Sequence, residues 1–303
     1  MMFSKGKNMY LDNRVTGRTK IIGIIGNPIE HSFSPQLHNT ISSYLNVDLV
    51  YVPFKVEKND LEKAVKGLKA LNLVGFNVTI PFKKDIMKYI DDNTKEALLM
   101  GAVNTVKNID GRFYGYNTDA EGFSRSFKEE SGVGFKDKKV AIIGAGGVSR
   151  AIAVKVAIEG AKKIAVLNRT ESKASELSEV INNNISKVSA GYGLDDKKAP
   201  EILKDCDIVI NTTSSGMYPD ILNCPLNDTF QFETGQIVYD AIYNPIKTSL
   251  LQRADEKGCI TINGLGMLFY QGINAYEIWT GIKLKEEKIK EIYKSFIALL
   301  GNK

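Results

Sequence analysis

The stretch Lys138–Ala151, with the sequence KKVAIIGAGGVSRA, decides the fold expected for this chain. Val140–Ile143 is a short apolar run, partly β-branched, which is typical of a buried parallel strand. Three glycines follow within four residues, and Ala151–Ile158 is predicted to be an apolar helix. This order of strand, turn and helix predicts a dinucleotide site, because glycines let the backbone approach a pyrophosphate that the helix N-terminus attracts. Ser149 replaces the usual third glycine, so a glycine-rich turn in another kind of α/β domain remains the alternative.

The residues after the next strand bear on which dinucleotide the chain would bind. Ile164–Leu167 is an apolar run that ends in Asn168-Arg169-Thr170, with no acidic residue at the strand end. Sites that prefer NAD usually carry Asp or Glu there, whereas an arginine accommodates the 2′-phosphate of NADP. A guanidinium binds a phosphate through two parallel hydrogen bonds, and Lys173 adds a further positive charge. We therefore expect NADP rather than NAD; the alternative is that Arg169 is a solvated loop charge.

Length and composition are those of an ordinary soluble globular protein. The 303 residues suggest two domains, and 43% of them are hydrophobic and 25% charged. The formal net charge of +5 is modest, and basic residues are interleaved with acidic ones, which argues against a nucleic-acid partner. No apolar run is long enough to cross a bilayer, and no signal peptide is evident, which argues against a membrane partner. The expected partner is a small-molecule substrate, and a homodimer is left open.

Three cysteines, Cys206, Cys224 and Cys259, lie far apart in the sequence. Their odd number and the absence of a CxxC or Cys/His cluster indicate neither a disulfide framework nor a zinc site, so no metal is expected. A reduced protein of the cytoplasm is the expected setting. Met1–Lys20 is polar and aperiodic, and it is predicted to be a disordered extension.

The first predicted strand runs into the loop Gly26–Pro35. Ser34 suits the N-cap of a helix, and Pro35 suits its first position. Ser32, Ser34 and His31 stand ahead of this helix N-terminus, where hydroxyls and backbone N–H groups could hold an anion. Simple capping is the favoured alternative on spacing alone.

Two further residues are placed for acid–base chemistry. Lys83 follows the strand Leu73–Ile80, at the edge of a parallel sheet where ligands bind. A lysine pKa of about 10.4 must fall before the side chain can act near neutrality, so a surface lysine like its neighbour Lys84 is the alternative. Thr118 or Asp119 is expected to cap the following helix, and Asp119 could be both a cap and a catalyst.

Periodicity predicts the remaining elements. Helices are expected over 35–45, 61–71, 94–100, 120–130, 172–181, 199–203, 248–257, 267–279 and 285–300. Strands are expected over 21–25, 49–56, 73–80, 140–143, 164–167, 185–190, 207–211, 236–241 and 260–263, with a hairpin turn at Asp110-Gly111 between 105–109 and 112–115. The alternation of strand and helix predicts an α/β fold.

Nine motifs occur along the chain in one order. They are GNPIEHSFSPQLHN, GFNVTIPFK, GAVNT, YGYNTDAEGF, GAGGVSRA, NRT, NTTSSGM, YDAIYNP and NGLGMLFYQG. Together they resemble the shikimate dehydrogenase family, whose members reduce 3-dehydroshikimate with NADPH on the shikimate pathway to chorismate and the aromatic amino acids. The resemblance extends from about Lys20 to the C-terminus. Each motif is weak by itself, but the ordered set is very specific.

The resemblance implies roles for particular residues. Lys83 and Asp119 would form the catalytic pair. The substrate-binding residues would be Ser32 and Ser34, which hold the carboxylate, together with Asn77, Thr79, Asn104, Asp119, Tyr243 and Gln271. The NADP-binding residues would be Gly144, Ala145, Gly146, Gly147, Val148, Ser149, Arg150, Asn168, Arg169, Thr170, Thr212, Ala241, Gly264 and Met267.

The resemblance also implies two domains, an N-terminal α/β substrate domain and a Rossmann-type dinucleotide-binding domain, with the active site in the cleft between them. The substrate domain would be discontinuous, 1–118 plus 264–303, and the NADP-binding domain would span 119–263. The presence of both serines favours shikimate over quinate. Two alternatives stay open: a quinate/shikimate dehydrogenase with relaxed cofactor use, and a dinucleotide-binding regulator without turnover.

Overall fold

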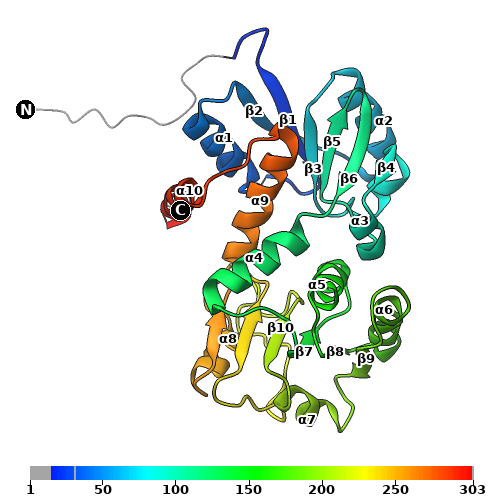
Figure 1. The fold of residues 1–303 in the computed structure, drawn as a ribbon, viewed down its shortest axis with the longest axis vertical. Coiled ribbons are helices and arrows are strands. Elements are labelled where there is room, and N and C mark those ends of the chain that lie inside the picture. Colours follow the sequence, from blue (N-terminus) through cyan, green and yellow to red (C-terminus); the bar gives the residue numbers. More distant parts are fainter. Residues whose placement is uncertain (1–14, 31, 302–303) are drawn as a thin grey trace, which may run out of the picture. The chain divides into compact units, whose positions relative to one another are not determined.

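The computed structural model describes residues 15–30 and 32–301 (Figure 1). His31 and the first 14 residues of the predicted N-terminal extension lie outside the described residues. The chain divides into two compact units. Unit 1 comprises Met1–Asp91, Thr105–Tyr114 and Tyr276–Lys303, and unit 2 comprises Asp92–Asn104 and Gly115–Ala275.

The N-terminal part of the chain forms a mixed sheet. Its elements are β1 (Lys20–Gly26), α1 (Ser34–Leu45), β2 (Leu49–Lys55), α2 (Leu61–Ala70), β3 (Gly75–Val78), β4 (Asp92–Asn93), α3 (Lys95–Met100), β5 (Thr105–Ile109) and β6 (Arg112–Tyr116), with 3₁₀ turns at Lys58–Asp60 and Asp85–Lys88. The strand order is β2-β1-β3-β5-β6-β4. β1 pairs in parallel with β2 and β3, and β3 pairs antiparallel with β5. The β5–β6 hairpin at Asp110-Gly111 confirms the predicted turn.

The second part of the chain forms a parallel sheet. Its elements are α4 (Asp119–Ser131), β7 (Lys139–Ile143), α5 (Gly147–Ile158), β8 (Lys163–Asn168), α6 (Glu171–Asn184), β9 (Ser189–Gly193), α7 (Ala199–Lys204), β10 (Ile208–Asn211), β11 (Ile237–Asp240), α8 (Ser249–Asp255), β12 (Ile260–Ile262), α9 (Leu265–Thr280) and α10 (Glu286–Gly301). The strand order is β12-β11-β10-β7-β8-β9, and neighbouring strands in it pair in parallel. The order reverses at β7, which lies between β8 and β10. Such a reversal is where open α/β sheets bind ligands.

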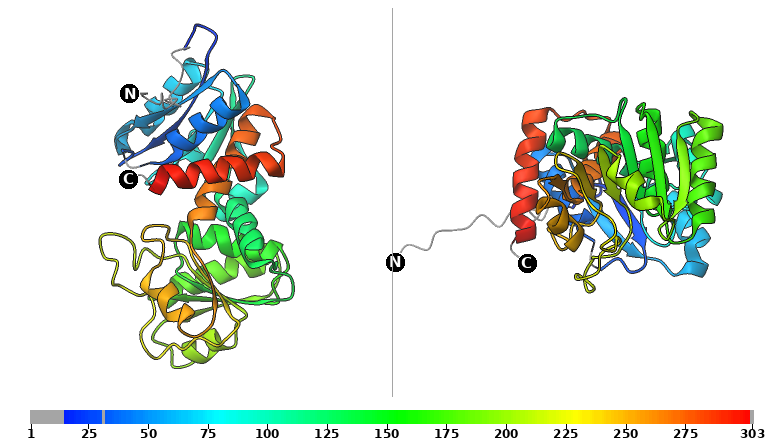
Figure 2. Two further views of the ribbon diagram at one scale, coloured as in Figure 1. Left: turned by 90° about the vertical axis from the view of Figure 1, so that its left-hand side faces the viewer. Right: turned by 90° about the horizontal axis from the view of Figure 1, so that it is seen from below.

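Helices cover both faces of the unit 2 sheet (Figures 1 and 2). Val140 and Ile142 of β7 pack into one core with α5 and α6, while Ala141 and Ile143 pack into the other with α7 and α8. Successive side chains of a strand point to opposite faces, so a strand buried on both sides must be apolar throughout. This is why Val140–Ile143 of β7 are all apolar.

The two units differ from the predicted domain ranges at three places. Residues 92–104, 115–118 and 264–275 lie in unit 2, whereas we expected them in the substrate domain. The first two lie there because α3, α4 and α5 share a buried cluster formed by Met100, Ala120, Ala151 and Val154. The third lies there because α9 crosses α4 closely at Gly122. The predicted cleft between the domains stays a prediction.

Several predicted boundaries shift. α1 begins at Ser34, and the N-cap is Phe33 rather than Ser34. α5 begins at Gly147 rather than Ala151, because Gly146 already serves as its N-cap. The strand expected over 185–190 forms at Ser189–Gly193 instead, since Ile185 and Val188 pack against the core beside α6. Among the described residues, no helix combines the length and the apolarity needed to span a bilayer.

Two helical glycines allow a matched test of the packing. A Cβ at Gly122 would lie 2.5 Å from the backbone nitrogen of Gln271, whereas a Cβ at Gly67 of α2 would meet nothing within 4 Å. We expect Gly122→Ala to destabilise the protein by about 2 kcal/mol, because two helix backbones must separate. Gly67→Ala should stabilise it by about 0.5–1 kcal/mol through helix propensity. Thermal unfolding of both variants measures this, and equal Tm values for the two would contradict it.

Candidate functional site

The glycine-rich turn after β7 is held by hydroxyl groups. Gly144 has φ +110°, and a Cβ there would lie 2.7 Å from Thr212 Oγ1, so only glycine fits without strain. Thr212 Oγ1 donates to the Ile143 carbonyl at 2.6 Å, and Ser149 Oγ lies 2.6 Å from Thr212 Oγ1. Because the Thr212 proton is used on Ile143, Ser149 donates to Thr212 and accepts from the Gly146 N–H at 3.0 Å. The serine at the third glycine position therefore braces the turn.

The turn leaves room for an anionic ligand. Gly146 and Gly147 are exposed, and a Cβ on either would meet nothing within 4 Å. The first N–H groups of α5 follow directly, and a helix N-terminus attracts phosphate. Ala145 and Val148 pack against the same core as Met267 and Ala241. The start of α9 therefore packs into the same core as the turn.

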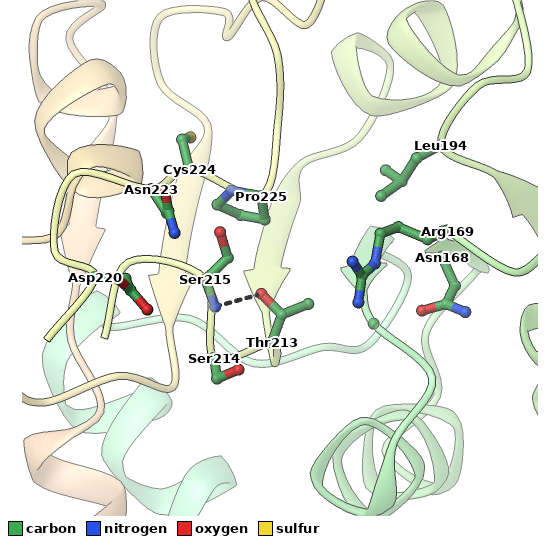
Figure 3. Close-up of a pocket in the computed structure, with 11 residues that line it drawn as sticks. Asn168, Arg169, Leu194, Thr213, Ser214, Ser215, Asp220, Asn223, Cys224 and Pro225 are labelled. Atoms are coloured by element: carbon green, nitrogen blue, oxygen red, sulfur yellow. Dashed lines mark hydrogen bonds between the residues drawn. The ribbon is translucent and has the colours of Figure 1, made fainter. Parts of the chain in front are cut away.

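A pocket of about 430 Å³ opens next to Gly144 (Figure 3). It is lined by Gly144, Asn168, Arg169, Leu194, Thr213, Ser214, Ser215, Asp220, Asn223, Cys224 and Pro225. Arg169 stands on the β8 side, facing the loop that follows β10 across the pocket. The volume is in the range of small-molecule sites. Sequence reasoning identified the first three lining residues, and the NTTSSGM motif contains Thr213, Ser214 and Ser215. It missed Leu194 and the lining residues at 220–225.

Two buried polar residues tie together the strand ends beside the pocket. Asp240 Oδ1 accepts from Asn211 Nδ2 at 2.9 Å and from the Ile242 N–H at 3.0 Å, and its Oδ2 accepts from Thr248 Oγ1 at 2.6 Å. Asn211 Oδ1 in turn accepts from the Thr213 N–H at 3.0 Å. Burial raises the pKa of Asp240 to about 6 despite these three hydrogen bonds. Sequence reasoning missed this brace, which fixes the loops after β10 and β11.

The loop after β11 carries two of the predicted site residues. A Cβ at Gly264 would lie 2.1 Å from the Ala241 carbonyl, and the Gly264 N–H donates to the Ile242 carbonyl at 3.0 Å. Gly264 and Ala241 are therefore in direct backbone contact. Tyr243 is 36% exposed at the carboxyl end of the same sheet.

Asp119 lies in a ring of amide contacts at the start of α4. Asn104 Nδ2 donates to Asp119 Oδ1 at 2.9 Å and to Thr118 Oγ1 at 3.0 Å. Asn104 Oδ1 accepts from the Thr118 N–H at 2.8 Å. Thr118, one of the two predicted caps, takes the N-cap position of α4, but its side chain makes no capping hydrogen bond. Instead Asn117 Oδ1 accepts from the Asp119 N–H at 3.1 Å, and Asn117 Nδ2 donates to the Ala102 carbonyl at 3.0 Å.

Gln271 lies near this ring because of the same helix crossing. Gly122, one turn after Asp119, meets the backbone of Gln271. Gln271 is 8% exposed, and its Nε2 donates to the Leu268 carbonyl at 2.8 Å. Its side chain is therefore held by its own helix. Asn104, Asp119 and Gln271 thus form one group within unit 2.

A second group of predicted residues lies within unit 1. Asn77 is 4% exposed; its Oδ1 accepts from the Tyr51 hydroxyl at 2.8 Å, and its Nδ2 donates to Thr105 Oγ1 at 3.0 Å. Ser32 Oγ accepts from the Ser34 N–H at 3.3 Å in the first turn of α1. Burial raises the pKa of Tyr51 well above its ordinary value, and a hydrogen bond with Ser34 opposes that shift. Ser34 and Asn77 therefore share Tyr51 as a neighbour.

Thr79 and Lys83 follow β3 in the same unit. The Thr79 N–H donates to the Ile25 carbonyl at 3.0 Å, and a Cβ at Gly26 would lie 2.3 Å from Thr79 Cγ2. Phe82 is buried, with its N–H bonded to the Thr79 carbonyl at 2.9 Å. Lys83 is half-buried in the turn just beyond this anchor. A 3₁₀ turn, Asp85–Lys88, follows Lys83.

His38 was missed as a candidate. It is fully buried and stacks on Tyr51 with ring centroids 4.4 Å apart and an interplanar angle of 11°. Burial lowers its pKa to about 3, so the imidazole is neutral at physiological pH. Its ring packs against the Tyr51 ring. Its position in the sequence of α1 does not distinguish it from an ordinary core residue.

The parallel sheet, its braced glycine turn and the pocket at the carboxyl ends of its strands define a Rossmann-type dinucleotide-binding protein. Three family models match the chain: the shikimate dehydrogenase substrate binding domain over 24–106, shikimate / quinate 5-dehydrogenase over 127–223, and the shikimate 5′-dehydrogenase C-terminal domain over 264–292. The chain belongs to the shikimate dehydrogenase family. This confirms the resemblance and the predicted α/β fold class.

Similar proteins cover nearly the whole chain. Shikimate dehydrogenase (NADP(+)) of Alkaliphilus oremlandii is 43% identical over 91% of this chain and 97% of its own. A crystal structure of a shikimate dehydrogenase in complex with NADP⁺ is 42% identical, with TM-score 0.83 over 93% of this chain and 97% of its own. The shikimate 5-dehydrogenase of Listeria monocytogenes, solved with shikimate and NAD, is 40% identical, with TM-score 0.86 over 92% and 98%.

The raised pKa of Asp240 predicts a particular dependence of stability on pH. Between its ordinary value of 3.8 and about 6, the folded protein retains a proton that the unfolded chain releases. The contribution of Asp240 to the free energy of unfolding is therefore greatest below pH 4 and is lost as the pH rises through about 6. Asp240→Asn lacks this dependence.

We therefore expect the Tm of wild type minus that of Asp240→Asn to fall between about pH 4.5 and about pH 7. Asp228→Asn, a change at an exposed position, should show a constant difference from wild type. A constant difference for Asp240→Asn as well would contradict the raised pKa.

Proposed function

We propose that the chain is an NADP-dependent shikimate dehydrogenase, which reversibly reduces 3-dehydroshikimate to shikimate in aromatic amino-acid biosynthesis. The observation that carries this proposal is the arrangement of the motif residues. The dinucleotide turn and Arg169 border one pocket, Asn104 and Asp119 are bonded to each other, and Ser34 and Asn77 adjoin the same tyrosine. Relatives named for this activity, at about 40% identity, support the assignment.

The residues of unit 2 fit NADP. Gly146, Gly147 and the N-terminus of α5 would hold the pyrophosphate, because that face of the turn is open. Arg169, with Asn168 and Thr170 beside it, would hold the 2′-phosphate through two parallel hydrogen bonds. Gly264, in backbone contact with Ala241, and Met267, at the start of α9, would border the nicotinamide. When bound, the cofactor supplies the hydride for reduction of the ring carbonyl.

The protein supplies charge, orientation and a proton. Lys83 gives the carbonyl oxygen a positive neighbour and a proton as negative charge develops there. Asp119 accepts a hydrogen bond from a substrate hydroxyl, and the amide of Asn104 keeps that carboxylate in place. The ring is thus held in the orientation that hydride transfer requires.

The remaining predicted residues bind the substrate. Ser32 and Ser34 hold the carboxylate at the N-terminus of α1, where hydroxyls and N–H groups favour an anion. Asn77, Thr79, Gln271 and Tyr243 bond to the ring hydroxyls or border the carboxylate. The amide of Asn77 is already anchored at both its oxygen and its nitrogen, and that of Gln271 at its nitrogen, so little side-chain entropy is lost on binding.

The wider setting follows from the same assignment. Cys206, Cys224 and Cys259 are free thiols, as a cytoplasmic enzyme would keep them. The domain ranges 1–118 plus 264–303 and 119–263 stay predictions, and a homodimer stays an open alternative. Analytical ultracentrifugation of the purified protein distinguishes a dimer from a monomer.

The test of the proposed function is nicotinamide absorbance with shikimate or quinate, each offered with NADP or NAD. We expect fast reduction with shikimate and NADP, and Lys83→Ala should lower kcat by about 10²–10⁴-fold with a much smaller change in KM. Lys84→Ala, at the exposed neighbouring lysine, is the matched control and should keep the wild-type kcat.

Other outcomes would redirect the proposal. Comparable rates with quinate or NAD would indicate a broader quinate/shikimate dehydrogenase. Binding of NADP without turnover in any combination would indicate a non-catalytic regulator. A near-normal kcat in Lys83→Ala would remove Lys83 from the reaction.

Arg169 should decide between the two dinucleotides. Loss of a charge-assisted bidentate contact predicts that Arg169→Ala raises the Kd for NADP by about 10–100-fold and leaves the Kd for NAD nearly unchanged. Lys162→Ala removes an exposed positive charge just before β8, at the opposite end of the strand, and should change neither value. Fluorescence titration with both dinucleotides measures this. An equal loss for NADP and NAD would contradict recognition of the 2′-phosphate.

A further inference from the structure

Arg150 does not behave like the other residues of the glycine-rich motif. It lies in the first turn of α5, but its Nε donates to the Leu99 carbonyl at 2.8 Å, near the end of α3. Gly101 ends α3 with φ +63°, and a Cβ there would lie 3.2 Å from Arg150 Cζ. The guanidinium therefore covers the end of α3, and any side chain at position 101 would displace it.

The segment that Arg150 holds leads directly to the Asp119 ring. Two residues after Gly101 comes the pair Val103-Asn104, and the Asn104 amide bonds Asp119. The Ala102 carbonyl accepts from Asn117, which also accepts the N–H of Asp119. Leu99, Ala102 and Asn104 are thus each held by a hydrogen bond to a residue of α5, of α4 or of the turn before α4.

α5 contacts α4 as well, through a second charged side chain. Lys155 of α5 pairs with Glu121 of α4 and lies 3.3 Å from Glu159, and the Lys155 side chain is only 13% exposed. Between Arg150 and Lys155 along α5, the side chains of Ala151 and Val154 pack with Ala120 of α4. The helix that starts at the dinucleotide turn therefore holds both segments that carry Asn104 and Asp119.

We propose that Arg150 is a positioning residue for the reaction, which keeps Asn104 and Asp119 in a fixed place relative to the dinucleotide turn. The inference rests on the proposed function, because Asn104 and Asp119 are its substrate-binding residues. Arg150 acts through the 99–104 segment, to which its guanidinium is bonded, and this role replaces the NADP contact that the resemblance implied for it. Removing its anchor lets Asn104 shift, and a small misplacement at a reacting centre lowers the rate strongly.

The test compares Arg150→Ala, Arg150→Met and Arg150→Lys in the full-length protein. Met keeps the packing over Gly101 and loses the donor, whereas Lys keeps a donor for the Leu99 carbonyl. With saturating NADP we expect Ala and Met to lower kcat/KM for shikimate by about tenfold, and Lys to restore most of it. The Kd for NADP should stay within about twofold of wild type, because the Ser149–Thr212 brace of the turn is intact.

A double-mutant cycle with Asn104→Ala separates positioning from a general structural role. If Arg150 acts through Asn104, the double variant loses less than the product of the two single losses. Arg125→Ala removes an arginine of α4 that pairs with Glu129 and stacks on Tyr270, and it is the control expected to keep kcat/KM.

Three outcomes would overturn the proposal: multiplicative losses in the cycle, a lowered Tm with unchanged kinetic constants, or weakened NADP binding with an unchanged KM for shikimate. Failure of the proposed function looks different. In that case the wild-type protein itself shows no turnover of shikimate, before any Arg150 variant is compared.

Discussion

The hydrogen bond between Ser149 and Thr212, at 2.6 Å, is the interaction on which the dinucleotide site depends. It joins the first turn of α5 to the end of β10, across the point where the strand order of the sheet reverses. Gly144 lies next to this bond with a positive φ, which favours glycine. A side chain at position 144 would also collide with both hydroxyls. The turn is therefore shaped before any ligand arrives, and a preformed anion site loses little free energy to ordering on binding.

Buried polar side chains also join neighbouring segments by hydrogen bonds at other strand and helix ends. Asn211 and Asp240 tie the ends of β10 and β11, Asn77 ties Tyr51 to Thr105, and Asn104 ties Thr118 to Asp119. A buried amide or carboxylate is costly unless its hydrogen bonds are made, so such groups hold one arrangement of their neighbours strongly. In each case the neighbours include a residue that we assign to substrate or cofactor binding. The polar braces thus position the site, while the apolar cores of the sheet support it from both faces.

α5 connects the two kinds of chemistry that the proposed reaction needs. Its first turn adjoins the dinucleotide site, and Arg150 and Lys155 hold the segments that carry Asn104 and Asp119. A single helix can serve both because its contacts with α3 and α4 are specific. The Arg150 guanidinium covers the C-terminus of α3, and Lys155 lies between Glu121 and Glu159. Such pairs specify geometry more than they add stability, because desolvation offsets much of their attraction.

The sequence by itself determined the α/β class and the Rossmann-type half, and its motifs supplied the residues that we propose for the site. Apolar periodicity, the glycine turn and the arginine after β8 are local signals, and the ordered set of motifs indicated the family. Only the tertiary structure decided which side chains hold these residues in place. Asn211 meets Asp240, Arg150 meets Leu99, and His38 stacks on Tyr51 only because strand register and helix packing bring distant positions together. The helix starts at Ser34 and Gly147 differ from the predicted ones for the same reason. These features depend on contacts between elements, which the periodicity of a single segment does not encode.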